Sequence, residues 1–295
     1  KSPEPAQSSK FNFISFFKKD TSFNIIIALL FLLVAVTFQL PNFARWIGFL
    51  IAGYAAIAND SIQTLGTFIA SNKNKPWWLL WIFIAGVFVC TVTYSWINYT
   101  GDVSYARLAS KGFESTPLSF NYLQVAAPIF LLILTRYKVP VSTTFLILTA
   151  FSTSGKSVLS VLSKSLTGYV LAFVLAAVVW LIVSNLINKY FTSDAHPIWR
   201  VFQWITTGTL WSVWLMQDAA NIAVFLPRQL SIYEFLGFTI PIVLALGFML
   251  FKGGARIQEI VDEKSRVTDV RSATLIDLIY AIILFYFKLH SKIPM

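Results

Sequence analysis

Residues 77–92, WWLLWIFIAGVFVCTV, decide the fold class of this chain because they contain no charged side chain. With its flanks, the stretch reaches the ~20 residues that an α-helix needs to cross a bilayer. A membrane β-strand needs only ~10 residues and alternates apolar with polar side chains, whereas this run is continuously apolar. A helix also pairs its own backbone N–H and C=O groups, as hydrocarbon requires. The stretch therefore predicts a membrane-spanning helix.

The rest of the chain has the same character. Hydrophobic residues make up 57% of it and charged residues 12%, against about 25% charged residues in a typical soluble domain. Further apolar runs occupy residues 25–39, 124–135, 166–183, 235–251 and 275–287. We expect an all-α, polytopic transmembrane bundle of about eight crossings. They are predicted near residues 22–40, 46–71, 76–98, 119–136, 158–188, 200–226, 233–251 and 272–290.

The basic residues lie between the apolar runs. A formal net charge of +10 would suggest a nucleic-acid partner in a soluble protein. Here the positions resemble membrane anchors and topology signals; they include Lys18, Lys19, Lys73, Lys75, Arg136 and Lys138. We expect an integral protein of a cell membrane, such as the bacterial inner membrane, in contact with the lipid bilayer and with no nucleic acid.

Four segments depart from the lipid-facing pattern. Residues 140–157 are apolar but rich in Ser and Thr, which predicts a re-entrant hairpin buried in protein or lining a cavity. Residues 100–118 and 252–271 carry mixed charges and are expected to be solvent loops, the second with room for a short surface helix. The polar residues 1–20 are expected to be a disordered or interfacial lead.

Two features recur in the same order along the chain. An acid between amides occurs in residues 58–63, ANDSIQ, and again in residues 216–221, MQDAAN; we call these the first and second acid motifs. A Lys-x-Pro sequence follows each, as KVPV at 138–141 and KIPM at 292–295. We expect two membrane repeats, 21–157 and 158–295, with a transport site between them. The second repeat would stop before a hairpin of its own.

An acid inside a membrane helix needs a partner, because an unpaired intramembrane carboxylate costs several kcal/mol. Neither Asp60 nor Asp218 has Lys or Arg within two helical turns in the sequence, and Arg228 is ten residues beyond Asp218. Hard cations such as Na⁺ take oxygen ligands. Asp60 and Asp218 are therefore candidate cation or metal ligands, for Na⁺ or a proton. The alternative is a carboxyl that is simply protonated or exposed at a helix end.

The hydroxyl segment, residues 142–144 with Ser142, Thr143 and Thr144, follows Pro140. Proline is favourable in the first turn of a helix. A half-helix starting there would present free N–H groups and its positive dipole end to an anion, without a fixed positive charge. The alternative is that these hydroxyls bond back to backbone carbonyls. His196 and His290 are remote from both acids in sequence, and no catalytic constellation indicates an enzyme.

These residues resemble the inorganic phosphate transporter (PiT) family, which carries a G-A-N-D-V-A-N-A-x-G-T signature in each half and a P-V-S-T-T-H hairpin. Here the corresponding stretches are AIANDSIQTLGT at 56–67, MQDAANIAVFLP at 216–227 and PVSTTF at 140–145. The resemblance implies phosphate symport with sodium or protons on an inverted-repeat fold. We also expect bound Na⁺ and a homodimer. The resemblance further implies cation binding by Asp60 and Asp218. It also implies phosphate and cation sites lined by Asn59, Gln63, Ser142, Thr143, Thr144, Gln217 and Asn221.

This chain departs from the family pattern at three positions. Gln63 and Gln217 replace asparagines, and Phe145 replaces the hairpin histidine. These changes leave open a carrier for another oxyanion such as sulfate, or a cation channel. The span count also places the helices of Asp60 and Asp218 in the same direction, whereas inverted repeats require opposite directions. One predicted span between residues 137 and 188 must therefore differ.

Overall fold

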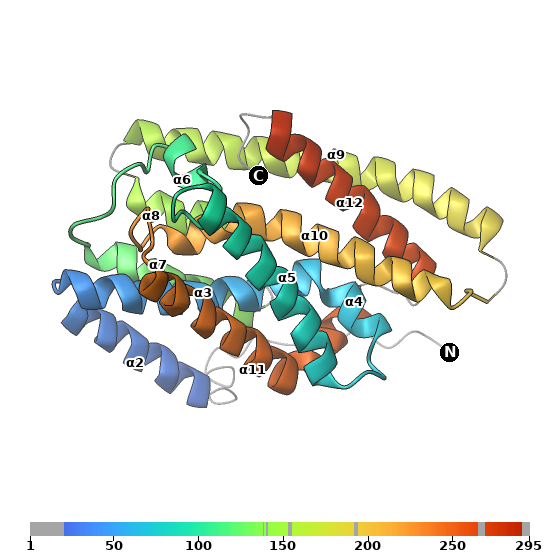
Figure 1. Cartoon of the computed structure of the whole chain (residues 1–295), viewed down its shortest axis with the longest axis horizontal. Coiled ribbons are helices and arrows are strands. Elements are labelled where there is room, and N and C mark those ends of the chain that lie inside the picture. The colour runs from blue at the N-terminus through green and yellow to red at the C-terminus, as the bar shows by residue number, and fades with distance from the viewer. Residues whose placement is uncertain are drawn as a thin grey trace, which may run out of the picture.

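Every regular element of the described chain is a helix, as the sequence predicts (Figure 1). The computed structural model describes residues 21–137, 139, 141–152, 155–191, 194–264 and 269–290. The elements are α2 (Thr21–Thr37), α3 (Pro41–Thr64), α4 (Gly66–Ser71), α5 (Trp77–Asn98), α6 (Arg107–Ser110), α7 (Tyr122–Arg136), the π-helical turn η1 (Thr144–Leu148), α8 (Thr149–Phe151), α9 (Gly155–Tyr190), α10 (Ile198–Ala223), α11 (Ile232–Lys264) and α12 (Val270–His290).

Local sequence explains where two of these helices begin. Before α7, the Asn121 side chain accepts from Gln124 N, and the Gln124 side chain accepts from Asn121 N, both at 2.9 Å. Before α11, Glu234 Oε2 accepts from Ser231 N at 2.9 Å, and Glu234 N donates to Ser231 Oγ at 3.4 Å. Both arrangements are capping boxes, which satisfy backbone N–H groups that have no partner within the helix.

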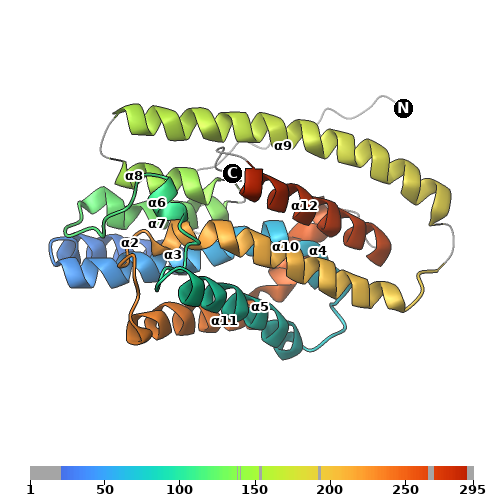
Figure 2. The same ribbon diagram turned by 45° about the horizontal axis from the view of Figure 1, so that its top comes forward.

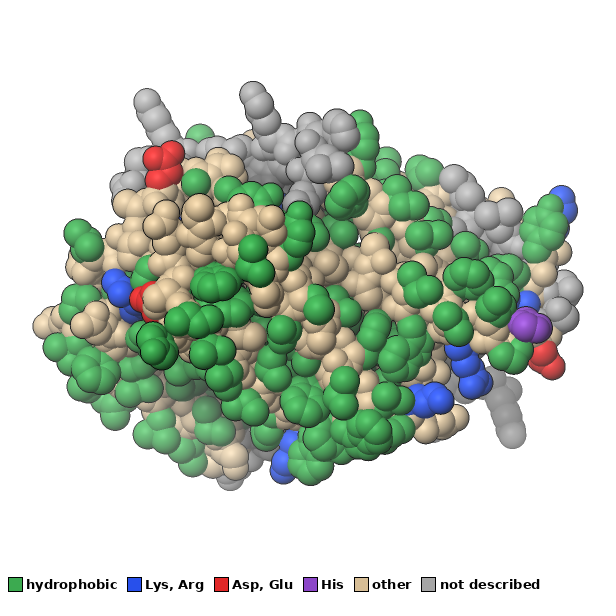
Figure 3. Space-filling view, in the orientation of Figure 1, with side chains coloured by type: hydrophobic (Ala, Val, Ile, Leu, Met, Phe, Trp, Pro, Cys, Tyr) green, Lys and Arg blue, Asp and Glu red, His purple; other side chains and the backbone are tan. Residues whose placement is uncertain are grey.

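Within the described residues, two helices, Trp77–Asn98 and Ile232–Lys252, are long and apolar enough to cross a membrane by length and composition. Shorter apolar helices occur at Thr21–Thr37, Tyr122–Arg136 and Leu166–Leu181. Large apolar side chains are exposed along α2, including Ile25, Leu29 and Leu32. Hydrophobic side chains also spread over the face seen in Figure 3. These features are consistent with a membrane protein, and the remaining crossings stay predictions.

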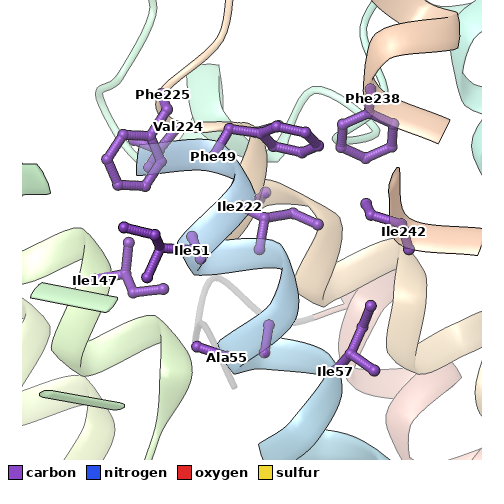
Figure 4. Close-up of a cluster of buried hydrophobic side chains, with 14 of the residues drawn as sticks. Phe49, Ile51, Ala55, Ile57, Ile147, Ile222, Val224, Phe225, Phe238 and Ile242 are labelled. Atoms are coloured by element: carbon purple, nitrogen blue, oxygen red, sulfur yellow. The ribbon is translucent and has the colours of Figure 1, made fainter. Parts of the chain in front are cut away.

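Helix α3 lies at the centre of the packing. It contacts α2, α7, α10 and α11, while α10 also contacts α5 and α12. Around α3, Figure 4 shows apolar side chains from four parts of the chain meeting in one core. The labelled side chains are Phe49, Ile51, Ala55, Ile57, Ile147, Ile222, Val224, Phe225, Phe238 and Ile242. Helix α9 instead runs along one edge of the bundle, next to α12 (Figure 2).

The chain reverses direction between α7 and η1. Phe120, just before α7, and Phe151, at the end of α8, have ring centroids 6.3 Å apart, so the two ends of residues 122–151 meet. We call these residues the helical hairpin. The predicted hairpin at 140–157 is therefore wrong in its bounds: α7 forms its first arm, and α9 already begins at Gly155. The position of this hairpin in a membrane stays a prediction.

The two acid-motif helices run in opposite directions in the structure. If the hairpin is re-entrant, the predicted span 119–136 is not a crossing, and the miscount then lies before residue 137, rather than between residues 137 and 188 as predicted from the sequence. Helix α3 runs from left to right in Figure 1, and α10 runs from right to left. Opposite directions are what inverted repeats require.

The two stretches expected to be solvent loops are more structured than predicted. Residues 100–118 include the short helix α6, and Val103, Ser104, Tyr105 and Leu108 are buried. In residues 252–271, α11 continues unbroken to Lys264 and α12 begins at Val270. The mixed charges therefore mark a helix end rather than a long loop.

Candidate functional site

The two predicted acids come together although they lie on different helices. Asp60 of α3 and Asp218 of α10 line one small cavity of about 20 Å³. Their carboxyl groups are hydrogen-bonded to each other. Asp60 is buried and Asp218 is partly buried, and two carboxyl groups in contact need a proton or a cation between them to offset the repulsion of like charges. The cavity holds a single water-sized group, so a tetrahedral oxyanion requires it to open.

The hydroxyl segment contacts the first acid motif. Asn59 Nδ2 lies 2.9 Å from Asp60 Oδ1 and 3.2 Å from both the Val141 carbonyl oxygen and Thr143 Oγ1. Thr143 Oγ1 in turn donates to Asp60 Oδ1 at 3.3 Å. All three polar side chains are buried. The amide of Asn59 thus holds the hairpin against the Asp60 carboxyl.

The next residue of the hydroxyl segment contacts the second acid motif. Asn221 Nδ2 donates to Thr144 Oγ1 at 2.9 Å and to Asp218 Oδ1 at 2.5 Å. Asn221 is 1% exposed, and its Oδ1 has no hydrogen-bond partner among the described residues. A buried amide oxygen without a donor is a ready ligand for a cation. Adjacent threonines therefore bridge the two acid motifs.

Ser142 has a local role. Its Oγ accepts from Phe145 N at 3.1 Å, which is the geometry of a cap at the start of a helical segment. The segment that follows begins as a π-helical turn, a form that often marks functional sites. Ser142 therefore caps its own segment by accepting from a backbone N–H, which differs from the alternative of bonding back to carbonyls, whereas Thr143 and Thr144 bond across to other helices.

The other predicted site positions do not join this network. Gln217 is half-buried on α10 and makes no recorded hydrogen bond within the described part of the chain. The side chain of Gln63 and the prolines Pro140 and Pro294 lie outside the described residues. The structure thus brings together Asn59, Asp60, Thr143, Thr144, Asp218 and Asn221.

A basic residue that sequence reasoning missed lies near this site. Arg107, the first residue of α6, is close enough for its charge to act on Asp218. Burial lowers the pKa of Arg107 from its ordinary value, and the negative charge of Asp218 opposes that shift. The sequence offers no signal for this pairing, because Arg107 stands in a charged loop far from either acid motif.

The loop carrying Arg107 is held by an unusually dense set of hydrogen bonds. The Asp102 carboxylate accepts from Ser104 N and Ala106 N, both at 2.7 Å, and from Ser104 Oγ at 2.9 Å. Tyr105 and Ala106 have φ of 55° and 58°. This left-handed region costs non-glycine residues roughly 1–2 kcal/mol each. Such strain persists only where surrounding contacts enforce it.

Arg228 fastens the same loop to the end of α10. Its guanidinium donates to the carbonyls of Leu226 at 2.8 Å, Phe113 at 2.7 Å and Ser115 at 3.1 Å. Burial lowers the pKa of Arg228 to about 10, so it stays protonated at neutral pH. Gly101 has φ 91°, and its carbonyl accepts from Leu230 N at 2.9 Å. The loop therefore covers the α10 end that carries Asp218.

Another buried acid among the described residues lies outside the predicted site. Asp277 of α12 is 2% exposed and is hydrogen-bonded by the hydroxyls of Thr207 and Thr67. Thr207 precedes Asp218 by eleven residues on α10, which places Asp277 roughly 16 Å away along the helix at ~1.5 Å per residue. The sequence did indicate Asp277 as a candidate site residue, because this acid interrupts the apolar run 275–287.

The chain was compared with protein-family models, curated proteins and solved structures, and none of them matches it. The family resemblance of the two acid motifs and the hydroxyl segment therefore stays an expectation. The geometry of the site carries the functional argument.

Proposed function

We propose that this protein is a secondary active transporter of inorganic phosphate, coupled to a gradient of Na⁺ or H⁺. The observation that carries the proposal is the bridge through Thr143 and Thr144. Thr143 bonds to Asp60, and Thr144 bonds to the Asn221 that holds Asp218. Both acid motifs and the hydroxyl segment thus belong to one site.

The architecture supports a transporter. Helices α3 and α10 run in opposite directions, as the two halves of an inverted repeat do around a site near the bilayer midplane. The α3–α4 segment breaks at Leu65, beside the first acid motif, and discontinuous helices are typical of transporter binding sites. The proposal includes a polytopic bundle in which residues 122–151 form a re-entrant hairpin.

Electrostatics supplies a reason for coupling. A phosphate anion near Asp60 and Asp218 is repelled by roughly 4 kcal/mol per unit charge pair at 4 Å and an effective dielectric of about 20. A repulsion of that size would weaken the affinity for phosphate about a thousandfold. A proton or Na⁺ held by the two carboxyls and the Asn221 oxygen removes it. Anion and cation then bind together or not at all, which is the requirement for symport.

Two other functions use the same chemistry. A carrier for sulfate would need the same hydroxyls and the same cation. A cation channel is favoured by one observation: the cavity of about 20 Å³ between the acids accommodates a cation and no tetrahedral anion. We prefer the transporter because the hydroxyls and the hairpin are superfluous for a channel.

The test is uptake of labelled phosphate into proteoliposomes with and without an inward Na⁺ or H⁺ gradient. The proposal predicts gradient-dependent uptake that unlabelled phosphate inhibits more strongly than sulfate. Asp60→Asn should abolish it while the protein remains monodisperse in detergent. Stronger inhibition by sulfate would indicate another oxyanion, and a cation current without saturable anion dependence would indicate a channel.

A further inference from the structure

The loop over the site carries two basic side chains on one face. Arg107 and Lys111 are four residues apart, the spacing that places side chains on the same side of a helical turn. Arg107 Nε and Lys111 Nζ are both out of contact with solvent. Basic groups in loops usually extend into water, so these two are directed into the protein. The α6 segment that carries Arg107 packs against α10.

The position of Arg107 is fixed by the backbone of the loop. Ser95 Oγ donates to the Asp102 carbonyl at 2.7 Å, and the Tyr105 hydroxyl donates to the Thr91 carbonyl at 2.6 Å. Both contacts anchor the loop to α5. Together with the Asp102 carboxylate and the left-handed residues before Arg107, they fix the backbone from which the Arg107 side chain extends. A cation on a fixed backbone, within electrostatic range of an acid of the site, is an arrangement that favours preorganised binding.

We propose that Arg107 is an oxyanion-binding residue of the transport site, supplying the fixed positive charge that the hydroxyl segment lacks. This inference rests on the proposed function and names a further ligand for its substrate. The planar guanidinium can donate two parallel hydrogen bonds to two oxygens of one tetrahedral anion. The negative charge of Asp218 acts on Arg107 while the site is empty. When the anion enters, Arg107 exchanges the carboxylate of Asp218 for the anion, and Asp218 becomes free to bind the coupling cation.

The test is equilibrium binding of labelled phosphate, and separately of labelled sulfate, to purified protein. The variants are Arg107→Gln, Arg107→Lys and, as a matched control, Arg45→Gln. Arg45 also contacts the loop, through the Pro117 carbonyl at 3.4 Å. We expect Arg107→Gln to weaken phosphate binding ~10- to 100-fold. Arg107→Lys should cause a smaller loss, because it keeps the charge but loses the planar fork. Arg45→Gln should bind like the wild type.

Each outcome bears on one proposal or both. Wild-type phosphate affinity in Arg107→Gln would overturn the role of Arg107 and leave the phosphate transporter standing. Unchanged affinity in folded Arg107→Lys would also count against it, if Arg107→Gln fails to fold. Sulfate binding that depends on Arg107, without phosphate binding, would support Arg107 and overturn the substrate. No binding of either anion by the wild type would overturn both.

Discussion

Replacing Thr143 by Val tests the contact between the hairpin and the first acid motif. Valine keeps the shape of threonine and removes the hydroxyl. In the structure that hydroxyl donates to Asp60 Oδ1 at 3.3 Å and accepts from Asn59 Nδ2 at 3.2 Å. The change leaves the Asp60 carboxyl with Asn59 and Asp218 as its remaining side-chain partners.

The size of the effect follows from the geometry. A hydrogen bond to a charged group contributes ~1.5–3 kcal/mol. The contacts of Thr143 with Asn59 and Asp60 lie at the long end of hydrogen-bond distances, so the lower value applies. About 1.5 kcal/mol corresponds to about a tenfold loss of apparent affinity. We expect that loss in the cation dependence of phosphate uptake, with the maximal rate less affected.

The control for this prediction is Thr91→Val. Thr91 is as buried as Thr143, but its hydroxyl bonds to the Val87 carbonyl at 2.7 Å and to Ser212 at 2.9 Å. The assay is uptake of labelled phosphate into proteoliposomes at graded cation concentrations, for both variants and the wild type. Unchanged affinity in Thr143→Val, or an equal loss in Thr91→Val, would refute the contact as a part of the site.

Two further predictions concern stability, measured as thermal unfolding in detergent. Gly48→Ala should destabilise the protein by ~1–3 kcal/mol, because the new Cβ would lie 2.4 Å from the buried ring of Phe225. Gly86→Ala, inside α5, meets nothing within 4 Å and should be stabilising by up to about 1 kcal/mol. Arg271 donates to Asp269 at 2.7 Å and lowers the pKa of that carboxyl, so the pair stabilises the fold above pH ~4 and loses its effect as the pH falls further. The melting difference between the wild type and Arg271→Gln should accordingly be present at pH 7 and shrink progressively as the pH falls below about 4, and a difference that does not shrink on acidification would contradict this assignment.

The sequence predicted the helices well because their signal is local. In a membrane, continuous apolar runs with few charges require internal backbone pairing, and each predicted run lies within a helix except for the last two residues of the run 25–39, which follow the end of α2. The predicted bounds of the hairpin were wrong because the length of its first helix was misjudged. The run 124–135 resembles a crossing in hydropathy, but α7 has only 15 residues, and nothing in its composition shows that the chain turns back after Arg136.

The site was predictable to the extent that its residues recur. The repetition of an acid between amides singled out Asp60 and Asp218 as partners, and the structure brings them together. Arg107 was missed because its role depends on a loop packing against α10, which no short sequence pattern encodes. Asp277 was missed although an acid within an apolar run is itself a signal, because it is not part of either acid motif.

The most direct test of the account is whether the two acids act as one site. It requires gradient-driven uptake of labelled phosphate by the wild type, by Asp60→Asn, by Asp218→Asn and by the double variant, in equal amounts of folded protein. Residues that act as a unit give non-additive losses. The account predicts that each single variant loses gradient-driven uptake and that the double variant is hardly worse than either. Gradient-driven uptake retained in one single variant, or losses that multiply in the double variant, would contradict it.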